Sequence, residues 1–242
     1  MKRRFVLLSL LLAFGPAAAR AAEPVDMLLV LAVDVSRSVT EAKFRLQREG
    51  TVAALSDPKV LRAITSGPNR RIAVCVVEWA AIGMETVVVD WTVIDGAEAA
   101  HSFGDRLIEM PRSFAGSTSI SGAIDYSVKQ IEHAPFTSDR HAIDISSDGN
   151  NNSGGSVTDA RDAAVSKGVT INALVILTPE GESFRPEHTN PEGGLEKYFQ
   201  DNVIGGPGSF TVVAESHESF GRALTKKLVQ EIAGRATSRR PS

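Results

Sequence analysis

The chain has 242 residues, 43% of them hydrophobic, and a formal net charge of −3 at pH 7. This length and apolar content are sufficient for one well-buried α/β domain. The mild acidity, with no basic stripe interleaved with aromatic residues, argues against a nucleic-acid-binding protein.

The first 22 residues have the pattern of a secretory signal peptide. A basic segment, Lys2-Arg3-Arg4, precedes an apolar segment from Phe5 to Phe14, and Ala19-Arg20-Ala21 places small residues at a cleavage point. The apolar segment is too short to span a bilayer, which takes about 20 residues. Cleavage near Ala21/Ala22 removes four basic residues and changes the formal net charge from −3 to −7. We therefore expect a periplasmic or secreted protein with no membrane span in the mature chain.

Strands and helices alternate along the rest of the sequence. Apolar runs predict strands at Met27 to Val33, Arg71 to Trp79, Thr86 to Thr92, His141 to Ser146, Thr170 to Leu177 and Ser209 to Val213. Helical periodicity predicts helices at Thr40 to Leu55, Ala97 to Met110, Ser119 to Glu132, Ser156 to Lys167 and Ser216 to Ala233, with a short one at Leu195 to Asn202. This alternation indicates a doubly wound, mostly parallel central sheet with helices on both faces.

The second and third predicted strands are too close together for a helix between them. Their short link through Gly83 predicts a hairpin, and hence one antiparallel edge strand. We expect one domain over residues 23–236 and a disordered tail over residues 237–242. The irregular segment from Thr178 to Gly208 follows a strand's carboxyl end, so it is expected near the ligand-binding edge.

Polar side chains follow the first strand at alternate positions. The apolar run from Met27 ends in Asp34-Val35-Ser36-Arg37-Ser38. A continuous apolar run is typical of a central strand covered on both faces, and open α/β sheets bind ligands beyond the carboxyl ends of such strands. Local alternatives remain, because Asp34, Ser36 or Ser38 could cap the next helix.

Two later segments are expected to reach the same edge. Thr118 lies in a run of small hydroxyl residues that leads into a helix, and Asp148-Gly149 follows the strand that begins at His141. Thr118 could instead be a helix cap and Asp148-Gly149 a plain turn. Together with Asp34, Ser36 and Ser38, these residues supply two carboxylates and three hydroxyls. An all-oxygen set suits a hard divalent cation such as Mg²⁺.

In this order and on these elements, the three segments resemble the metal-ion-dependent adhesion site (MIDAS) of the von Willebrand factor type A (vWA) family. The resemblance covers roughly Val25 to Gly234, and it extends to an uncharacterised bacterial branch with a signal peptide and one such domain. It implies that the hydroxyls of Ser36, Ser38 and Thr118 coordinate the ion, and that Asp34 and Asp148 bind it directly or through water. Mg²⁺ is the expected ion, with Mn²⁺ and Ca²⁺ as the other options. The implied function is binding, through an open coordination position, of an Asp or Glu carboxylate on an unknown protein partner.

Other functions remain as alternatives. A structural scaffold would use the ion as a clamp, with Glu78 or Glu180 filling the open position. A haloacid-dehalogenase-type phosphohydrolase would use Asp34, Thr118 and Asp148, but it needs a second carboxylate where this chain has Ser36, and a serine cannot act as the general acid. We therefore expect no enzymatic activity.

Metal motifs of other kinds are not apparent in the sequence. The histidines have no zinc-site spacing, and Gly155 stands where a calcium loop needs a glutamate. Cys75, the single cysteine, lies in an apolar run and is expected to be a buried packing residue. The polar loop from Asn150 to Gly155 is expected either to form part of the rim of the ion site or to be a simple turn.

Overall fold

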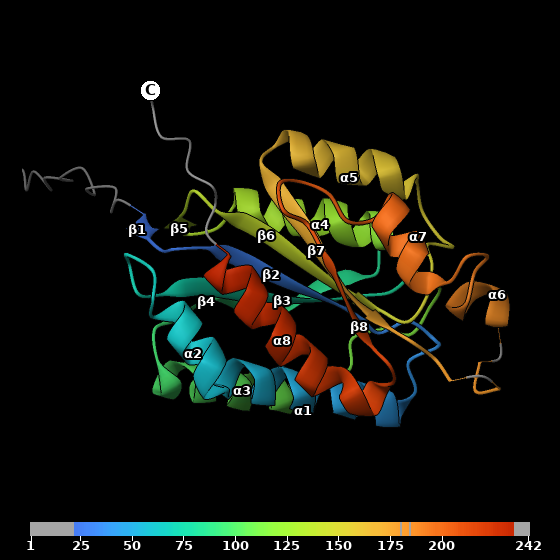
Figure 1. The fold of residues 1–242 in the computed structure, drawn as a ribbon, viewed down its shortest axis with the longest axis horizontal. Helices are drawn as coiled ribbons and strands as arrows, with labels where there is room; N and C mark the ends of the chain where they lie inside the picture. Colours follow the sequence, from blue (N-terminus) through green and yellow to red (C-terminus); the bar gives the residue numbers. More distant parts are fainter. Residues whose placement is uncertain (1–21, 180, 184, 235–242) are drawn as a thin grey trace, which may run out of the picture.

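The computed structural model describes residues 22–179, 181–183 and 185–234. It contains a six-stranded sheet in the order β4-β3-β2-β6-β7-β8, in which β4 is antiparallel to β3 and the other neighbours are parallel (Figure 1). The strands are β2 (Leu28–Asp34), β3 (Ile72–Trp79), β4 (Glu85–Ile94), β6 (His141–Ser147), β7 (Val169–Ile176) and β8 (Thr211–Ala214). The predicted fold class, including the antiparallel edge strand, is confirmed.

Helices cover both faces of this sheet (Figure 1). One layer holds α1 (Glu41–Ser56), α2 (Pro58–Ile64), α3 (Ala97–Glu109) and α8 (Phe220–Ala233), and the other holds α4 (Ile120–Glu132), α5 (Val157–Ser166) and α7 (Leu195–Asn202). Shorter elements are α6 (Pro186–Thr189), the 3₁₀ turn η1 (His217–Ser219), and the strands β1 (Glu23–Pro24) and β5 (Phe136–Thr137), which pair with each other. Within the described residues, no helix has both the length and the apolar content needed to cross a bilayer.

The central strand β2 is buried along its whole length, as its unbroken apolar run predicts. Successive side chains of a strand point to opposite faces. Leu29 and Leu31 accordingly pack into the core under α1 and α8, and Leu28 and Val30 pack into the core under α4. The edge strand β4 is only partly buried.

Several short elements were not predicted from the sequence. Asp57 caps α2 by accepting a hydrogen bond from the backbone N–H of Lys59 at 2.7 Å, and Pro58 occupies the first helical turn. This helix has seven residues, and α6 has four, which is too short for a periodic pattern to show. The last helix, predicted from Ser216, begins instead as the turn η1, and α8 proper starts at Phe220.

The strand order places a topological switch point, where open α/β sheets commonly bind ligands, between β2 and β6. The chain leaves β2 toward β3 on one side and returns later to β6 on the other, so the topology switches at this point. The register pairs Val33 with Ser146, which places Asp34 and Ser147 side by side at the carboxyl ends of the two strands. The predicted signal peptide, apart from Ala22, and the tail at 237–242 lie outside the described residues.

Candidate functional site

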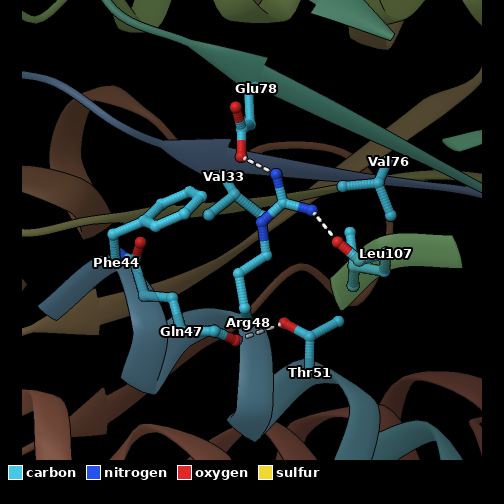
Figure 2. A pocket seen from close by; sticks show the side chains of 8 residues that line it. All are labelled: Val33, Phe44, Gln47, Arg48, Thr51, Val76, Glu78 and Leu107. Atoms are coloured by element: carbon cyan, nitrogen blue, oxygen red, sulfur yellow. Dashed lines mark hydrogen bonds and ion pairs between the residues drawn. The ribbon is translucent and has the colours of Figure 1, made fainter. Parts of the chain in front are cut away.

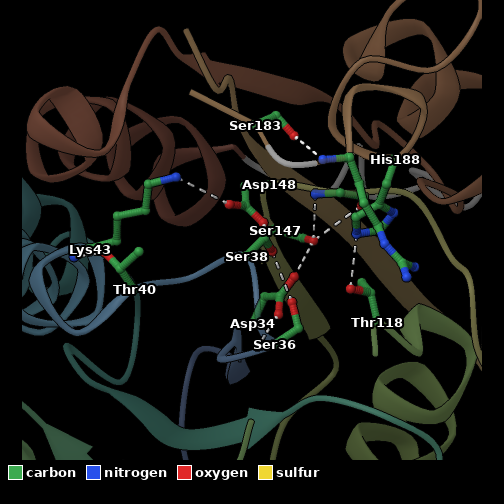
Figure 3. Close-up of polar contacts among 12 residues, drawn as sticks. Asp34, Ser36, Ser38, Thr40, Lys43, Thr118, Ser147, Asp148, Ser183 and His188 are labelled. Carbon is green, nitrogen blue, oxygen red and sulfur yellow. Dashed lines mark hydrogen bonds and ion pairs between the residues drawn. The ribbon is translucent and has the colours of Figure 1, made fainter. Parts of the chain in front are cut away.

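Hydrogen bonds link four of the five predicted site residues across the edge of the sheet (Figure 3). Asp34 ends β2, and its Oδ1 accepts a bond from the backbone N–H of Ser36 at 2.7 Å. The hydroxyl oxygens of Ser36 and Ser38 are 3.2 Å apart, and that of Ser38 donates to Oδ1 of Asp148 at 2.6 Å. The loop after β2 and the loop after β6 are therefore joined at this point.

The fifth residue, Thr118, lies in the loop before α4. It lines a pocket of about 40 Å³ together with Ser36 and Ser38. Its backbone N–H donates to Oδ1 of Asn152 at 2.8 Å, and its carbonyl accepts from the N–H of Asn152 at 2.9 Å. All five predicted residues thus lie at one edge of the sheet. Asn152, from the loop between Asn150 and Gly155, lines the pocket there, which favours the first of the two roles expected for this loop.

The capping alternatives for the hydroxyl residues are wrong. Thr40 caps α1, and its hydroxyl accepts from the N–H of Lys43 at 3.3 Å. Ser119 caps α4, and its hydroxyl accepts from the N–H of Gly122 at 3.2 Å. Ser36, Ser38 and Thr118 therefore have no capping role.

Arg112 holds the loop after β2 in place. One guanidinium nitrogen, Nη2, donates to the carbonyls of Val35 at 2.6 Å and Ser36 at 2.8 Å, and Nε donates to the carbonyl of Phe114 at 2.8 Å. The planar guanidinium suits several fixed acceptors at once. It thereby fixes the backbone that carries Ser36.

Two buried carboxylates, Asp34 and Asp148, lie at this edge of the sheet. Asp34 is fully buried, and its burial, followed by the nearby negative charge of Asp148, raises its pKa to about 7, although hydrogen bonds from Ser147 and Ser36 oppose the shift. The bond from Ser147 to Oδ2 of Asp34 is 2.5 Å long. Nζ of Lys43, 3.8 Å from Oδ2 of Asp148, supplies one positive charge to two carboxylates.

These residues fit a hard divalent cation. Oδ2 of Asp148 is buried without a hydrogen-bond donor among the described residues, although buried carboxylate oxygens are normally paired. Two carboxylates and three hydroxyls are the oxygen donors that Mg²⁺, Mn²⁺ or Ca²⁺ accepts. The part of the chain that the structure describes holds no group of three or more His, Cys, Asp or Glu side chains suited to a metal. A metal at this edge thus depends on the hydroxyls.

His188, which was not predicted as a site residue, lines the same pocket. His188 belongs to α6, in the irregular segment predicted to lie near this edge, and its Nε2 is 3.1 Å from Oγ1 of Thr118. Burial lowers its pKa, and Asp148 opposes that effect. The two contacting residues are 70 positions apart, and no local pattern links them.

Glu78 does not reach the candidate site, contrary to the clamp alternative. Its carboxylate pairs with the guanidinium of Arg48 (Figure 2). It also accepts a hydrogen bond from the N–H of Ser113 at 2.9 Å. Arg48 also donates to the carbonyl of Leu107, and the side chain of Gln47 lines the adjoining cavity of about 10 Å³. This cluster ties α1 to β3 and α3. Glu180, the other candidate, lies outside the described residues.

Cys75 is fully buried in β3, as predicted. Burial, with a smaller contribution from Asp90, raises the pKa of its thiol to about 12, so the thiol is neutral and packs as a small apolar group.

The family model described as "Protein of unknown function (DUF1194)" matches residues 24–236. The chain belongs to the DUF1194 family. No curated protein matches the sequence of this DUF1194 chain.

Solved structures confirm that this DUF1194 protein has the vWA fold. Proximal thread matrix protein 1 from the mussel byssus, with a zinc-occupied MIDAS motif, is 14% identical over 87% of this chain and 49% of that chain, with a TM-score of 0.59. The pilus adhesin SpaC from Lactobacillus rhamnosus GG is 15% identical over 88% of this chain and 31% of that chain, with a TM-score of 0.59. A von Willebrand factor type A structure from Catenulispora acidiphila is 12% identical over 86% of this chain and 43% of that chain, with a TM-score of 0.55. The DUF1194 chain thus spans about half the length of the mussel protein, and less of the other two.

Proposed function

We propose that this protein is an exported binding module that takes an acidic group of a partner protein through a divalent cation, with Mg²⁺ as the preferred ion. Asp34, Ser36, Ser38, Thr118 and Asp148 would hold the ion, the carboxylates directly or through water. The bound cation would supply an electrophilic coordination position for a partner's Asp or Glu carboxylate. The predicted leader supports delivery to the periplasm or the cell exterior.

The observation that carries this proposal is the buried Oδ2 of Asp148, which no donor in the described residues satisfies. It lies beside a second buried carboxylate, Asp34, whose pKa is raised by burial and by Asp148. Two buried negative charges in contact with hydroxyl oxygens are costly unless a cation balances them. A divalent cation offsets both charges and takes the hydroxyls as neutral ligands.

The pocket beside these oxygens supports an anionic ligand. Arg37 and Arg185 line it together with the three predicted hydroxyl ligands, and both arginine side chains are exposed. A guanidinium matches a carboxylate through two parallel hydrogen bonds. These two residues place positive charge where an incoming acidic side chain would lie.

The structural relatives support a divalent cation and an adhesive role. The mussel byssus protein has zinc in its MIDAS motif, and SpaC is a pilus adhesin. Identities near 15% transfer only the fold, so the roles of the residues rest on the contacts described above.

The alternatives are less well supported. A clamp requires a protein side chain in the open position, and Glu78 is bound to Arg48 instead. A haloacid-dehalogenase-type phosphohydrolase requires a carboxylate at the position of Ser36, whose hydroxyl instead faces that of Ser38. We therefore propose that the protein binds a ligand without catalysing a reaction.

The experiment that tests carboxylate recognition uses a defined probe. A deca-glutamate peptide and a deca-glutamine peptide are titrated against the immobilised protein by interferometry, in Mg²⁺ and in chelator. We expect only the glutamate peptide to bind, only in Mg²⁺, and not to the Asp148→Ala variant. Asp105→Ala, which removes an exposed carboxylate on α3, is the matched control and should bind as the wild type does. Binding that persists in chelator, or no binding to the wild type, would contradict the proposal.

A further inference from the structure

His188 is held against the candidate metal site by contacts that involve both its ring and its backbone. Only 7% of the residue is exposed. Its carbonyl accepts from the N–H of Asn150 at 3.1 Å. Its ring fills the space beside Gly149, where an added Cβ would lie 2.1 Å from Nε2. The Asp148-Gly149 sequence therefore leaves room for this imidazole.

The contacts of Nδ1 determine which ring nitrogen carries the proton. Nδ1 is 2.6 Å from Oδ1 of Asn150 and 3.2 Å from Nδ2 of Asn152. The amide of Asn152 is oriented by the N–H of Thr118, which donates to its Oδ1. One nitrogen cannot donate to Asn150 and accept from Asn152 at the same time. The shorter contact is the donation to Asn150, which places the proton on Nδ1.

A neutral ring protonated on Nδ1 has a lone pair on Nε2. Nε2 lies 3.1 Å from Oγ1 of Thr118, so the threonine hydroxyl donates a hydrogen bond to this lone pair. Both lone pairs of Oγ1 then remain available to a cation. The opposite tautomer would donate to Oγ1 and consume a lone pair that coordination requires.

We propose that His188 is a positioning residue of the metal centre, whose Nε2 accepts a hydrogen bond from the Thr118 hydroxyl and so turns the lone pairs of Oγ1 toward the cation. The inference rests on the proposed function, because it concerns the same ion. Groups that orient metal ligands commonly contribute about 10- to 100-fold in affinity. Because α6 carries His188, this part of the segment after β7 contributes to ion affinity through a residue that is not itself a ligand.

The first test is the tautomer in the metal-free protein. Long-range ¹H–¹⁵N correlation spectra of the full chain should show His188 protonated on Nδ1 and unprotonated on Nε2. A ring protonated on Nε2 alone would overturn the proposal. This measurement does not depend on whether the protein binds a metal.

The second test compares two substitutions by calorimetric titration with Mg²⁺. His188→Asn keeps an amide near the place of Nδ1 and loses the acceptor at Nε2, whereas His188→Gln places an amide oxygen near the position of Nε2. We expect His188→Asn to weaken Mg²⁺ binding about 10- to 100-fold and His188→Gln to stay within about threefold of the wild type. A purely structural role of His188 would weaken Mg²⁺ binding equally in both variants. Thermal unfolding of the two variants checks that both are folded.

Three outcomes distinguish a failure of the His188 proposal from a failure of the proposed metal site. Wild-type affinity in the His188→Asn variant would overturn the role of His188 and leave the metal site intact. An equal loss of Mg²⁺ affinity in both variants, with a shift of the wild-type Nε2 resonance on adding Mg²⁺, would make His188 a direct ligand and overturn the positioning role. A folded wild type that binds no Mg²⁺ would overturn the proposed function, and the inference with it.

Discussion

Nζ of Lys43 lies 3.8 Å from Oδ2 of Asp148, the buried oxygen that has no hydrogen-bond donor among the described residues. Lys43 is in the first turn of α1, and its ammonium group is the positive charge paired with Asp148. A lysine so placed competes with a cation for the same carboxylate.

Removing this charge should therefore strengthen ion binding. We expect Lys43→Ala to raise Mg²⁺ affinity by at least about fivefold, because two unit charges 4 Å apart interact by roughly 1 kcal/mol even in bulk water and by more near a protein surface. Calorimetric titration at low ionic strength measures the change. Lys59→Ala, which removes an exposed lysine from α2, should leave the affinity unchanged. Weaker binding in Lys43→Ala would mean that the ammonium supports the site.

Ion binding should depend on pH through Asp34. Its pKa is raised to about 7 by burial and by Asp148, and a cation binds only the carboxylate form. Mg²⁺ affinity should therefore fall as the pH is lowered through 7, by about tenfold per pH unit well below it. Titrations at pH 8, 7, 6 and 5 measure this slope, and a flat profile would contradict the assignment of Asp34.

The stability of the metal-free protein should change with pH in the opposite sense. Folding raises the pKa of Asp34 from 3.8 to about 7, so the folded protein holds this proton more tightly than the unfolded chain does. The resulting contribution to the free energy of unfolding is fully present below about pH 4 and is lost as the pH rises through 7. Asp144, whose pKa burial raises to about 6, acts in the same direction. Urea unfolding in chelator should show a smaller pH dependence for Asp34→Asn than for the wild type. Identical dependence would show that Asp34 ionises normally.

Gly149 should be required for the placement of His188. An alanine Cβ there would lie 2.1 Å from Nε2, so the ring must move away from Thr118. We expect Gly149→Ala to weaken Mg²⁺ binding about as much as His188→Asn does, roughly 10- to 100-fold. Gly155 in the same loop has no atom within 4 Å of an added Cβ, so Gly155→Ala is the matched control. Equal affinities for the two glycine variants would show that the ring position is unimportant.

A buried ionic cluster anchors α8 to the sheet. Nζ of Lys227 lies 2.6 Å from Oδ2 of Asp144 on β6 and 3.0 Å from Oε2 of Glu231, and Nδ2 of Asn172 donates to Glu231 at 2.7 Å. Burial alone would lower the pKa of Lys227, but the two carboxylates outweigh it and raise that pKa. The lysine is therefore charged in the folded protein.

Removing Lys227 should destabilise the fold strongly. Lys227→Met leaves two buried carboxylates without a cation, which costs about 3–5 kcal/mol of unfolding free energy. The neighbouring Lys226 is exposed, and Lys226→Met should change stability by less than about 0.5 kcal/mol. Urea unfolding of both variants gives the comparison. A similar, small loss in the two variants would show that the cluster does not anchor α8.

The sheet, and the gathering of the five residues at one of its edges, could be predicted from the sequence because both follow from local patterns. The unbroken apolar run of β2 identifies a central strand, and parallel strands bring the residues after their carboxyl ends together. Thr118 could be predicted at the same edge because its hydroxyl-rich segment leads directly into the helix α4. The roles of these residues as metal ligands stay predictions, as do the leader and the tail.

The contacts that the sequence did not predict join residues far apart in the chain. His188 meets Thr118 across 70 positions, and Arg112 meets Val35 across 77. Such pairs follow from how loops pack rather than from propensity or periodicity. For Lys43 a signal was available, because the predicted helix from Thr40 begins two residues after Ser38 and its first turn must lie beside the site.

The central claim is that this edge of the sheet binds one divalent cation. The most direct test is calorimetric titration of the protein with Mg²⁺ at pH 8, beside Asp34→Ala, Asp148→Ala and the exposed control Asp105→Ala. We expect saturable one-site binding for the wild type and the control, and no binding for the other two variants although they remain folded. A folded wild type without binding, or equal binding by Asp148→Ala, would contradict the claim.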